Sequence, residues 1–489
     1  MTEGALQTLL QQAQDHRDAG RWVEAIALFS RAESLAPAVA SIKHNLAVAY
    51  YANGEGAAAE TKARQAVTIQ PSLWQSHALL AKMYRTSGNI GSALRAWQCV
   101  LQQNNGNPVA LLGLADLSMN ELGDPERAAS LVEPLHRDPS FKADAELTTL
   151  TAHLYMGTDT DVRLSERLTE FSEAHLRLPL TTARQIRTGR RRIALISPLF
   201  STSPVYHFAY SALRSVAREH DLVIFHRGQR SDGGTAAFQE IAAEWHDVSA
   251  LESVALAQLL AAADLDILID LGGWSDVAGL AALSVKPAAR MYKWVGGQSA
   301  TTGLPMFDGW IGDKWQSPPE LAGLYAEPVI NIDGGYVDYT PPPSLARFAE
   351  KKKTGVGLVS NPAKIGAKTI AAWPQEVTAV TLIDRRYIHD QTRHRVVELL
   401  GKAGIKVSGV IAPKAHDDYL QALASCAAIV NTQPYSAGLT AVEAHHLGVQ
   451  VLSKGEAGSL FCSRHHLSHA ETRGRNPLLA AQLLQLLSA

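Results

Sequence analysis

The spacing of hydrophobic and polar residues changes near residue 190. Before that point, apolar residues recur every three or four positions, as they do in amphipathic helices. After it, short apolar runs rich in β-branched residues alternate with helical patterns of about 10–15 residues, which is typical of βαβ units around a parallel sheet. The chain of 489 residues is therefore predicted to have a helical N-terminal part and an α/β C-terminal part.

Glycines in the helical part recur at a fixed period. They are Gly20, Gly54, Gly88 and Gly123. The intervals are 34, 34 and 35 residues, and an alanine follows each glycine by five residues. Glycine permits a tight turn between two helices, and alanine lets the helices approach closely. Residues 1–140 thus resemble about four tetratricopeptide repeats, an α-solenoid whose groove holds peptides or mediates self-association. We expect a protein partner there and leave a homo-oligomer open.

The remaining chain divides into a connector and two sheet-forming segments. Residues 141–190 have helical spacing without the repeat period and are predicted to be a helical connector. Two series of candidate strands follow, RIALIS, DLVIFH, DILIDL, MYKWVG and WIGD before the proline-rich segment 340–344, and VGLVS, AVTLID, KVSGVIA, AAIVNT and VQVLS after it. They predict Rossmann-like domains over 191–345 and 346–489, with ligand binding in a cleft at the carboxyl ends of the strands.

Composition narrows the class of protein. Apolar residues make up 46% and charged residues 19%, as in ordinary globular proteins. Lys and Arg number 45 against 47 Asp and Glu, so the net charge does not favour a nucleic-acid partner. The three cysteines are too few and too scattered for a disulfide framework or a zinc site. The first residues lack the basic and apolar regions of a signal peptide, and no later window offers 18 uncharged apolar residues. We expect a cytoplasmic protein without a membrane span.

Several sequence blocks carry a family resemblance. They are RRIALISPLFSTSPVYHF, DILIDLGGW, KPAARMYKWVGGQSATTGLPMFDGWIGDKWQSP, SNPAKIGAKTIAAW, GVIAPKAHDDYL and NTQPYSAGLTAVEAHHLG. Over roughly residues 190–465, the chain resembles the catalytic region of O-GlcNAc transferase and its bacterial relatives, including cytoplasmic asparagine N-glucosyltransferases. The resemblance implies a GT-B fold made of the two Rossmann-like domains. It also implies a nucleotide-sugar donor, most simply UDP-linked, and catalysis without a metal or another cofactor.

The resemblance also implies a catalytic lysine, Lys364, in the second Rossmann-like domain. The donor-binding set in the same domain is Lys414, Gly438, Leu439, Thr440 and Glu443. Lys364 stands where the family has the cation that contacts the donor diphosphate, and a fixed cation stabilises a departing phosphate. Lys414 resembles the lysine beside the base, and Glu443 would accept hydrogen bonds from the ribose. The plainer interpretation makes both lysines exposed loop residues and Glu443 a solvated helix residue.

The helix before Glu443 departs from the family pattern. The family usually has His-Thr-Thr where this chain has Gly438, Leu439 and Thr440. Only Thr440 can then supply a hydroxyl, so backbone N–H groups at the helix start would have to hold the phosphates.

The acceptor and sugar side is predicted from the first Rossmann-like domain. His207 fits the second histidine of a two-histidine loop and could position or deprotonate an acceptor, although a helix-start histidine is as often a cap or packing residue. Ser203 stands in the place of the first histidine. Trp274 stands where many bacterial relatives have histidine or tyrosine. The loop GGQSATTGLP, whose alternative is an ordinary polar turn, adds Ser299, Thr301 and Thr302.

These features together predict an inverting glycosyltransferase that modifies a Ser/Thr or Asn side chain of a protein bound by the repeats. Two alternatives stay open. One is a flagellin-type modifier that uses another activated sugar, such as a CMP-linked nonulosonic acid, and the other is a non-catalytic scaffold with a degenerate catalytic half. A metal site is not expected, because adjacent His445 and His446 point in different directions from a helix.

Overall fold

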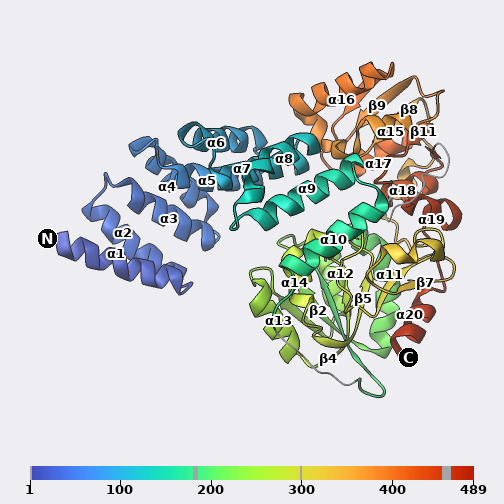
Figure 1. Cartoon of the computed structure of the whole chain (residues 1–489), viewed down its shortest axis with the longest axis horizontal. Helices are drawn as coiled ribbons and strands as arrows, with labels where there is room; N and C mark the ends of the chain where they lie inside the picture. Colours follow the sequence, from blue (N-terminus) through green and yellow to red (C-terminus); the bar gives the residue numbers. More distant parts are fainter. Residues whose placement is uncertain (1–2, 180–185, 298–299, 454–463, 489) are drawn as a thin grey trace. The chain divides into compact units, whose positions relative to one another are not determined.

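The computed structural model describes residues 3–179, 186–297, 300–453 and 464–488, and it divides into two compact units, Met1–Thr149 and Leu150–Ala489 (Figure 1). In the described part of the chain, no helix is both long enough and apolar enough to cross a membrane.

The first unit is built from helical hairpins. Its helices are α1 (Glu3–Asp18), α2 (Trp22–Leu35), α3 (Ala40–Ala52), α4 (Gly56–Ile69), α5 (Trp74–Thr86), α6 (Ile90–Gln103), α7 (Pro108–Asn120), α8 (Pro125–Val132) and the 3₁₀ turn η1 (Glu133–Arg137). The four periodic glycines have φ between 63° and 82°, which side chains rarely allow. The four alanines that follow them are fully buried. The predicted helical repeats are thus confirmed, with glycine at the turn and alanine at the helix contact.

The glycine period continues one step into the segment where we expect it to be lost. Helices α9 (Lys142–Met156) and α10 (Asp161–His175) are separated by a turn in which Gly157 has φ 63°. Gly157 lies 34 residues after Gly123, but the position of the buried alanine is taken by the exposed Val162. The segment therefore keeps the turn of a repeat without its close helix contact.

Seven parallel strands form the first sheet, in the order β3-β2-β1-β4-β5-β6-β7. They are β1 (Arg192–Ser197), β2 (Asp221–His226), β3 (Glu244–Asp247), β4 (Leu265–Asp270), β5 (Ala288–Trp294), β6 (Gly309–Gly312) and β7 (Val329–Asn331). The helices in this part of the chain are α11 (Pro204–Glu219), α12 (Gly233–Ile241), α13 (Ser253–Ala262) and α14 (Val277–Leu283), with 3₁₀ turns η2 (Gly273–Ser275), η3 (Pro319–Leu324) and η4 (Leu345–Phe348).

Five parallel strands form the second sheet, in the order β10-β9-β8-β11-β12. They are β8 (Val356–Val359), β9 (Ala379–Ile383), β10 (Lys406–Ile411), β11 (Ala428–Val430) and β12 (Gln450–Leu452). Its helices are α15 (Ala367–Ala371), α16 (Asp390–Lys402), α17 (His416–Ala424), α18 (Leu439–His446) and α19 (His465–Thr472), with 3₁₀ turns η5 (Pro362–Lys364) and η6 (Arg385–Ile388). All ten predicted strands are present, and both sheets are doubly wound.

The two sheets share a core within the second unit. One buried apolar cluster includes side chains of β1 and α11 together with side chains of α17, α18 and the last helix, α20 (Leu479–Ser488). Helix α20 packs against α11, so the end of the segment predicted as the second domain returns to the first sheet (Figure 1). This packing brings helix starts and strand ends of both sheets into one neighbourhood.

Candidate functional site

The turn that carries Lys364 is held by its neighbours. It follows β8, the central strand of the second sheet. The carbonyl of Lys364 accepts a hydrogen bond from Oγ1 of Thr369 at 2.7 Å. The Arg395 guanidinium on α16 donates to the carbonyls of Pro362 at 3.2 Å and Ile365 at 3.0 Å. These bonds satisfy the carbonyls on either side of Lys364 and fix where its side chain starts.

The Lys364 ammonium lies against the loop between β11 and α18. Its Nζ is 3.7 Å from the ring centroid of Tyr435 and 3.4 Å from the carbonyl oxygen of Ser436. Because β8 and β11 are neighbouring parallel strands, both loops leave the same edge of the sheet. Lys364 is therefore half-buried between two loops, and the interpretation as a plain exposed lysine does not hold.

Glu443 is a buried carboxylate with a histidine partner. It lies on α18 and is 1% exposed, so it is not a solvated helix residue. Its Oε1 is 3.1 Å from Nε2 of His416, the first residue of α17. This contact with Glu443 raises the pKa of His416 above its usual value. His416 was not singled out from the sequence, although it lies two residues after Lys414.

The start of α18 offers backbone groups more than side chains. Gly438 is the N-cap residue, and the Leu439 side chain packs against the shared apolar core. The Thr440 hydroxyl accepts a hydrogen bond from the Tyr419 hydroxyl at 3.1 Å. Lys414 is exposed, and the Asp418 carboxylate accepts a hydrogen bond from its backbone N–H at 3.2 Å. The nucleotide-binding roles of these residues stay predictions.

His207 connects the two halves of the second unit. This buried residue of α11 has Nδ1 2.8 Å from the carbonyl oxygen of Thr340, and its own carbonyl accepts from the Thr340 N–H at 2.6 Å. Since a carbonyl only accepts, Nδ1 carries the proton and Nε2 keeps its lone pair in the neutral ring. Burial lowers the pKa of His207 and favours that neutral form. Its ring centroid is 6.0 Å from that of His416, so it stands close to the Glu443 pair.

Ser203 is an N-cap of α11. Its hydroxyl accepts from the Val205 N–H at 3.2 Å and donates to the Leu199 carbonyl at 2.8 Å. The hydroxyl thus both donates and accepts inside the protein as a helix cap, and the role of Ser203 on the acceptor and sugar side stays a prediction.

Trp274, Thr301 and Thr302 also have internal partners. The Trp274 indole N–H donates to the Thr301 carbonyl at 2.8 Å. Both threonines are fully buried, and their hydroxyls donate to the carboxylate of Glu327, at 2.6 Å for Thr301. Burial raises the pKa of Glu327. These hydrogen bonds stabilise the loop. The role of these three residues on the acceptor and sugar side stays a prediction, and Ser299 lies outside the described residues.

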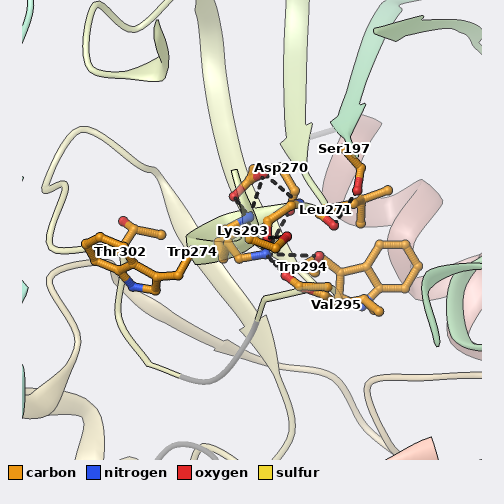
Figure 2. A network of polar contacts seen from close by, with 12 residues as sticks. Ser197, Asp270, Leu271, Trp274, Lys293, Trp294, Val295 and Thr302 are labelled. Carbon is orange, nitrogen blue, oxygen red and sulfur yellow. Dashed lines mark hydrogen bonds and ion pairs between the residues drawn. The ribbon is translucent and has the colours of Figure 1, made fainter. Parts of the chain in front are cut away.

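A buried lysine at the end of β5 donates hydrogen bonds to backbone carbonyls at the ends of β4 and β5 (Figure 2). This lysine was not predicted from the sequence. Lys293 is fully buried, and its Nζ lies 2.8 Å from the carbonyl oxygen of Val295, 2.5 Å from that of Gly296 and 3.2 Å from that of Asp270. The Asp270 carboxylate, 3.6 Å from Nζ, accepts from the Gly273 N–H at 3.0 Å. The only sequence signal was one lysine within an apolar strand.

The loops that follow β4 and β5 touch backbone to backbone. A Cβ on Gly296 would lie 2.0 Å from the Leu271 carbonyl oxygen, and one on Gly297 would lie 2.1 Å from that of Gly272. Only glycine fits such an approach. Lys293 and these glycines therefore hold the loops after β4 and β5 of the first sheet in close contact with each other.

Among the described residues, no three His, Cys, Asp or Glu side chains are placed to hold an ion.

Comparison with known proteins supports the family resemblance. No family model matches the chain. A relative named probable UDP-N-acetylglucosamine–peptide N-acetylglucosaminyltransferase SPINDLY, from Solanum lycopersicum, is 23% identical over 369 residues, covering 70% of this chain and 39% of the relative. The Arabidopsis thaliana protein of the same name is 25% identical over 286 residues, covering 55% of this chain and 31% of the relative. The chain thus spans about two fifths or less of the length of these relatives.

A solved structure matches over the whole chain. A mutant O-GlcNAc transferase of Thermobaculum terrenum aligns with a TM-score of 0.56 and 21% identity, covering 100% of this chain and 93% of that protein. This match identifies the fold as a tetratricopeptide solenoid followed by a GT-B pair of Rossmann-like domains, as predicted.

Proposed function

From its relationship to the O-GlcNAc transferase-like proteins, we propose that this chain is an inverting glycosyltransferase that moves a sugar from a nucleotide donor to a protein side chain. The relatives are named as UDP-N-acetylglucosamine–peptide transferases, so UDP is the proposed leaving group. The observation that carries the proposal is the half-buried Lys364 ammonium, held between two strand-end loops of the second sheet.

Lys364 would act on the departing diphosphate. When the bond between the anomeric carbon and the phosphate oxygen breaks, negative charge grows on the nucleotide. A fixed ammonium therefore stabilises the transition state more than the ground state. The N-terminal backbone dipoles of α18, at Gly438 and Leu439, would add to this stabilisation.

Glu443 and His416 would hold the nucleoside. A buried carboxylate can accept hydrogen bonds from both ribose hydroxyls. The His416 ring lies 3.1 Å from one carboxylate oxygen and is itself 40% exposed. Lys414 is proposed to lie beside the base.

His207 would serve the acceptor. Its Nε2 can accept the proton that a Ser/Thr hydroxyl or an Asn amide loses as that group bonds to the anomeric carbon. The transfer is then a single displacement with inversion, and UDP leaves with the electron pair of the broken bond. The repeats are proposed to hold the acceptor protein.

The direct test is transfer itself. Intact-mass analysis of acceptor proteins co-expressed with the chain should show the mass of one sugar, and Lys364→Met should abolish most of this gain while the protein stays folded. The stem of the lysine is kept in this variant, so packing changes little. Transfer should also persist in EDTA, and restoration by Mn²⁺ after a loss in EDTA would contradict the metal-free mechanism.

Nucleotide binding distinguishes the alternatives. UDP should raise the melting temperature of the wild-type chain, because a ligand that binds only the folded state stabilises it. Stabilisation by CMP but not UDP would redirect the proposal to a CMP-linked sugar. Stabilisation by neither nucleotide would favour the scaffold.

A further inference from the structure

The ring of Tyr435 contacts two side chains, those of Lys364 and Tyr155. The Lys364 ammonium lies 3.7 Å from the ring centroid. Tyr155, in the last turn of α9, also stacks on the Tyr435 ring, with centroids 5.6 Å apart and planes inclined by 27°. The end of α9 is thus linked to the proposed leaving-group lysine through one aromatic ring.

The turn after α9 is seated on the same region. A Cβ on Gly157 would lie 2.8 Å from Cδ of Pro434, the residue before Tyr435, so only glycine fits there. The Lys368 ammonium donates a hydrogen bond to the Gly157 carbonyl. Pro434 belongs to the loop that contacts Lys364. Lys368 lies four residues after Lys364 in the chain. The α9 turn therefore contacts the loop between β11 and α18 and also α15, the helix that follows the Lys364 turn.

A lysine needs such support to act as a fixed cation. Its four-carbon stem is flexible and carries about 2 kcal/mol of rotamer entropy. An ammonium within about 6 Å of an aromatic centroid is attracted by the ring face, and the distance here is well inside that limit. The ring covers one face of the ammonium, while a phosphate would be bound by its N–H groups.

We propose that Tyr435 is a positioning residue that holds the Lys364 ammonium ready for the donor diphosphate, and that Tyr155 keeps the Tyr435 ring in place. This inference rests on the proposed function of Lys364.

The first test needs no nucleotide. The full chain is acetylated lightly with an N-hydroxysuccinimide ester, and the modification rate of Lys364 is compared with that of the exposed Lys414 by peptide mass spectrometry. Tyr435→Leu should raise the relative rate at Lys364 roughly threefold or more, on the scale of a cation–π contact. Tyr435→Phe keeps the ring and should stay near wild type. Tyr155→Leu, outside the loop, should give a smaller rise.

The second test measures binding by calorimetry with UDP and with uridine. Tyr435→Leu should weaken UDP binding roughly twofold to thirtyfold. Uridine binding should not change, because uridine has no phosphate. In a Lys364→Met background, Tyr435→Leu should cause no further loss. Tyr435→Phe should restore the affinity for UDP.

The outcomes separate this inference from the function on which it rests. Wild-type chain that fails to bind UDP would contradict the proposed donor, while the acetylation rates would still show whether the ring holds the lysine. An unchanged Lys364 rate in both leucine variants would overturn the inference. So would tighter UDP binding by Tyr435→Leu, since the ring would then compete with the phosphate. Equal effects of Tyr435→Phe and Tyr435→Leu would point to the hydroxyl instead.

Discussion

The two sheets of the second unit use polar residues at their strand ends in opposite ways. After β4 and β5 of the first sheet, the polar groups bind one another, with the Lys293 ammonium fully buried among backbone carbonyls. After β8 and β11 of the second sheet, Lys364 is only half-buried, and Glu443 is paired with the partly exposed His416. The same fold position can therefore hold either a closed internal network or groups that we propose bind the donor. The partial exposure of Lys364 and His416, against the full burial of Lys293, distinguishes the two.

The largest effect is expected from opening the closed network. Lys293→Met keeps the length of the side chain but removes the donor to four backbone carbonyls. Breaking a buried charged pair costs about 3–5 kcal/mol, so the free energy of unfolding in urea should fall by that order. The matched control is Lys402→Met, an exposed lysine paired with the exposed Glu398 on one helix, which should leave the stability close to that of the wild type. Similar losses in the two variants would show that the network adds nothing.

A smaller effect is expected from the ligand side. Glu443→Gln removes the charge that would bind the ribose hydroxyls, and hydrogen bonds to charged groups contribute about 1.5–3 kcal/mol. UDP affinity should therefore fall about tenfold or more, with a matching rise in donor KM and little change in kcat. Calorimetry and steady-state kinetics measure the two effects. A large fall in kcat at unchanged KM would place Glu443 in the chemical step instead.

Ser203→Ala tests the cap on the closed side. Loss of an N-cap hydroxyl costs about 0.5–2 kcal/mol of stability, measurable by urea unfolding. UDP affinity should stay at the wild-type value, because the hydroxyl is used within the first half. A changed preference among donor sugars at unchanged stability would contradict the cap role and favour the predicted role of Ser203 on the acceptor and sugar side.

The smallest effect concerns the pH dependence of stability. The pKa of His416 is raised by Glu443, so the folded state binds this proton more tightly than the unfolded state. The resulting stabilisation is complete below the unfolded pKa of about 6.5 and is lost as pH rises through the raised value. Solvent screening keeps it small, since the His416 side chain is 40% exposed. His416→Gln should remove this contribution, so the stability difference from wild type should be greater at about pH 5.5 than at about pH 8.5.

Local patterns predicted the fold well, because period and strand composition are local properties. The glycine and alanine positions identified the repeats, and the apolar runs identified ten strands. Strand β3 was missed because its sequence EWHD is polar at a sheet edge, and the short strand β7 at the opposite edge was missed as well.

The site was predicted less completely. Lys364 and Glu443 were predicted from the family resemblance. In the structure Lys364 is half-buried and Glu443 is buried. Lys293 and the stacking of Tyr155 on Tyr435 were missed, because each depends on segments that only the tertiary fold brings together. The internal hydrogen bonds of Ser203, Thr301 and Thr302 could not be predicted either, since a sequence does not show which partner a hydroxyl finds.

Hydrogen–deuterium exchange of the full chain with and without UDP tests most directly whether the nucleotide is held by the second half alone. We expect UDP to slow exchange of backbone amides in residues 361–366 and 431–443, which surround Lys364 and the start of α18. Residues 271–276 and 300–304, in the closed loops of the first half, should exchange at the same rate in both samples. Protection confined to those first-half loops, with none around Lys364 or α18, would contradict the assignment.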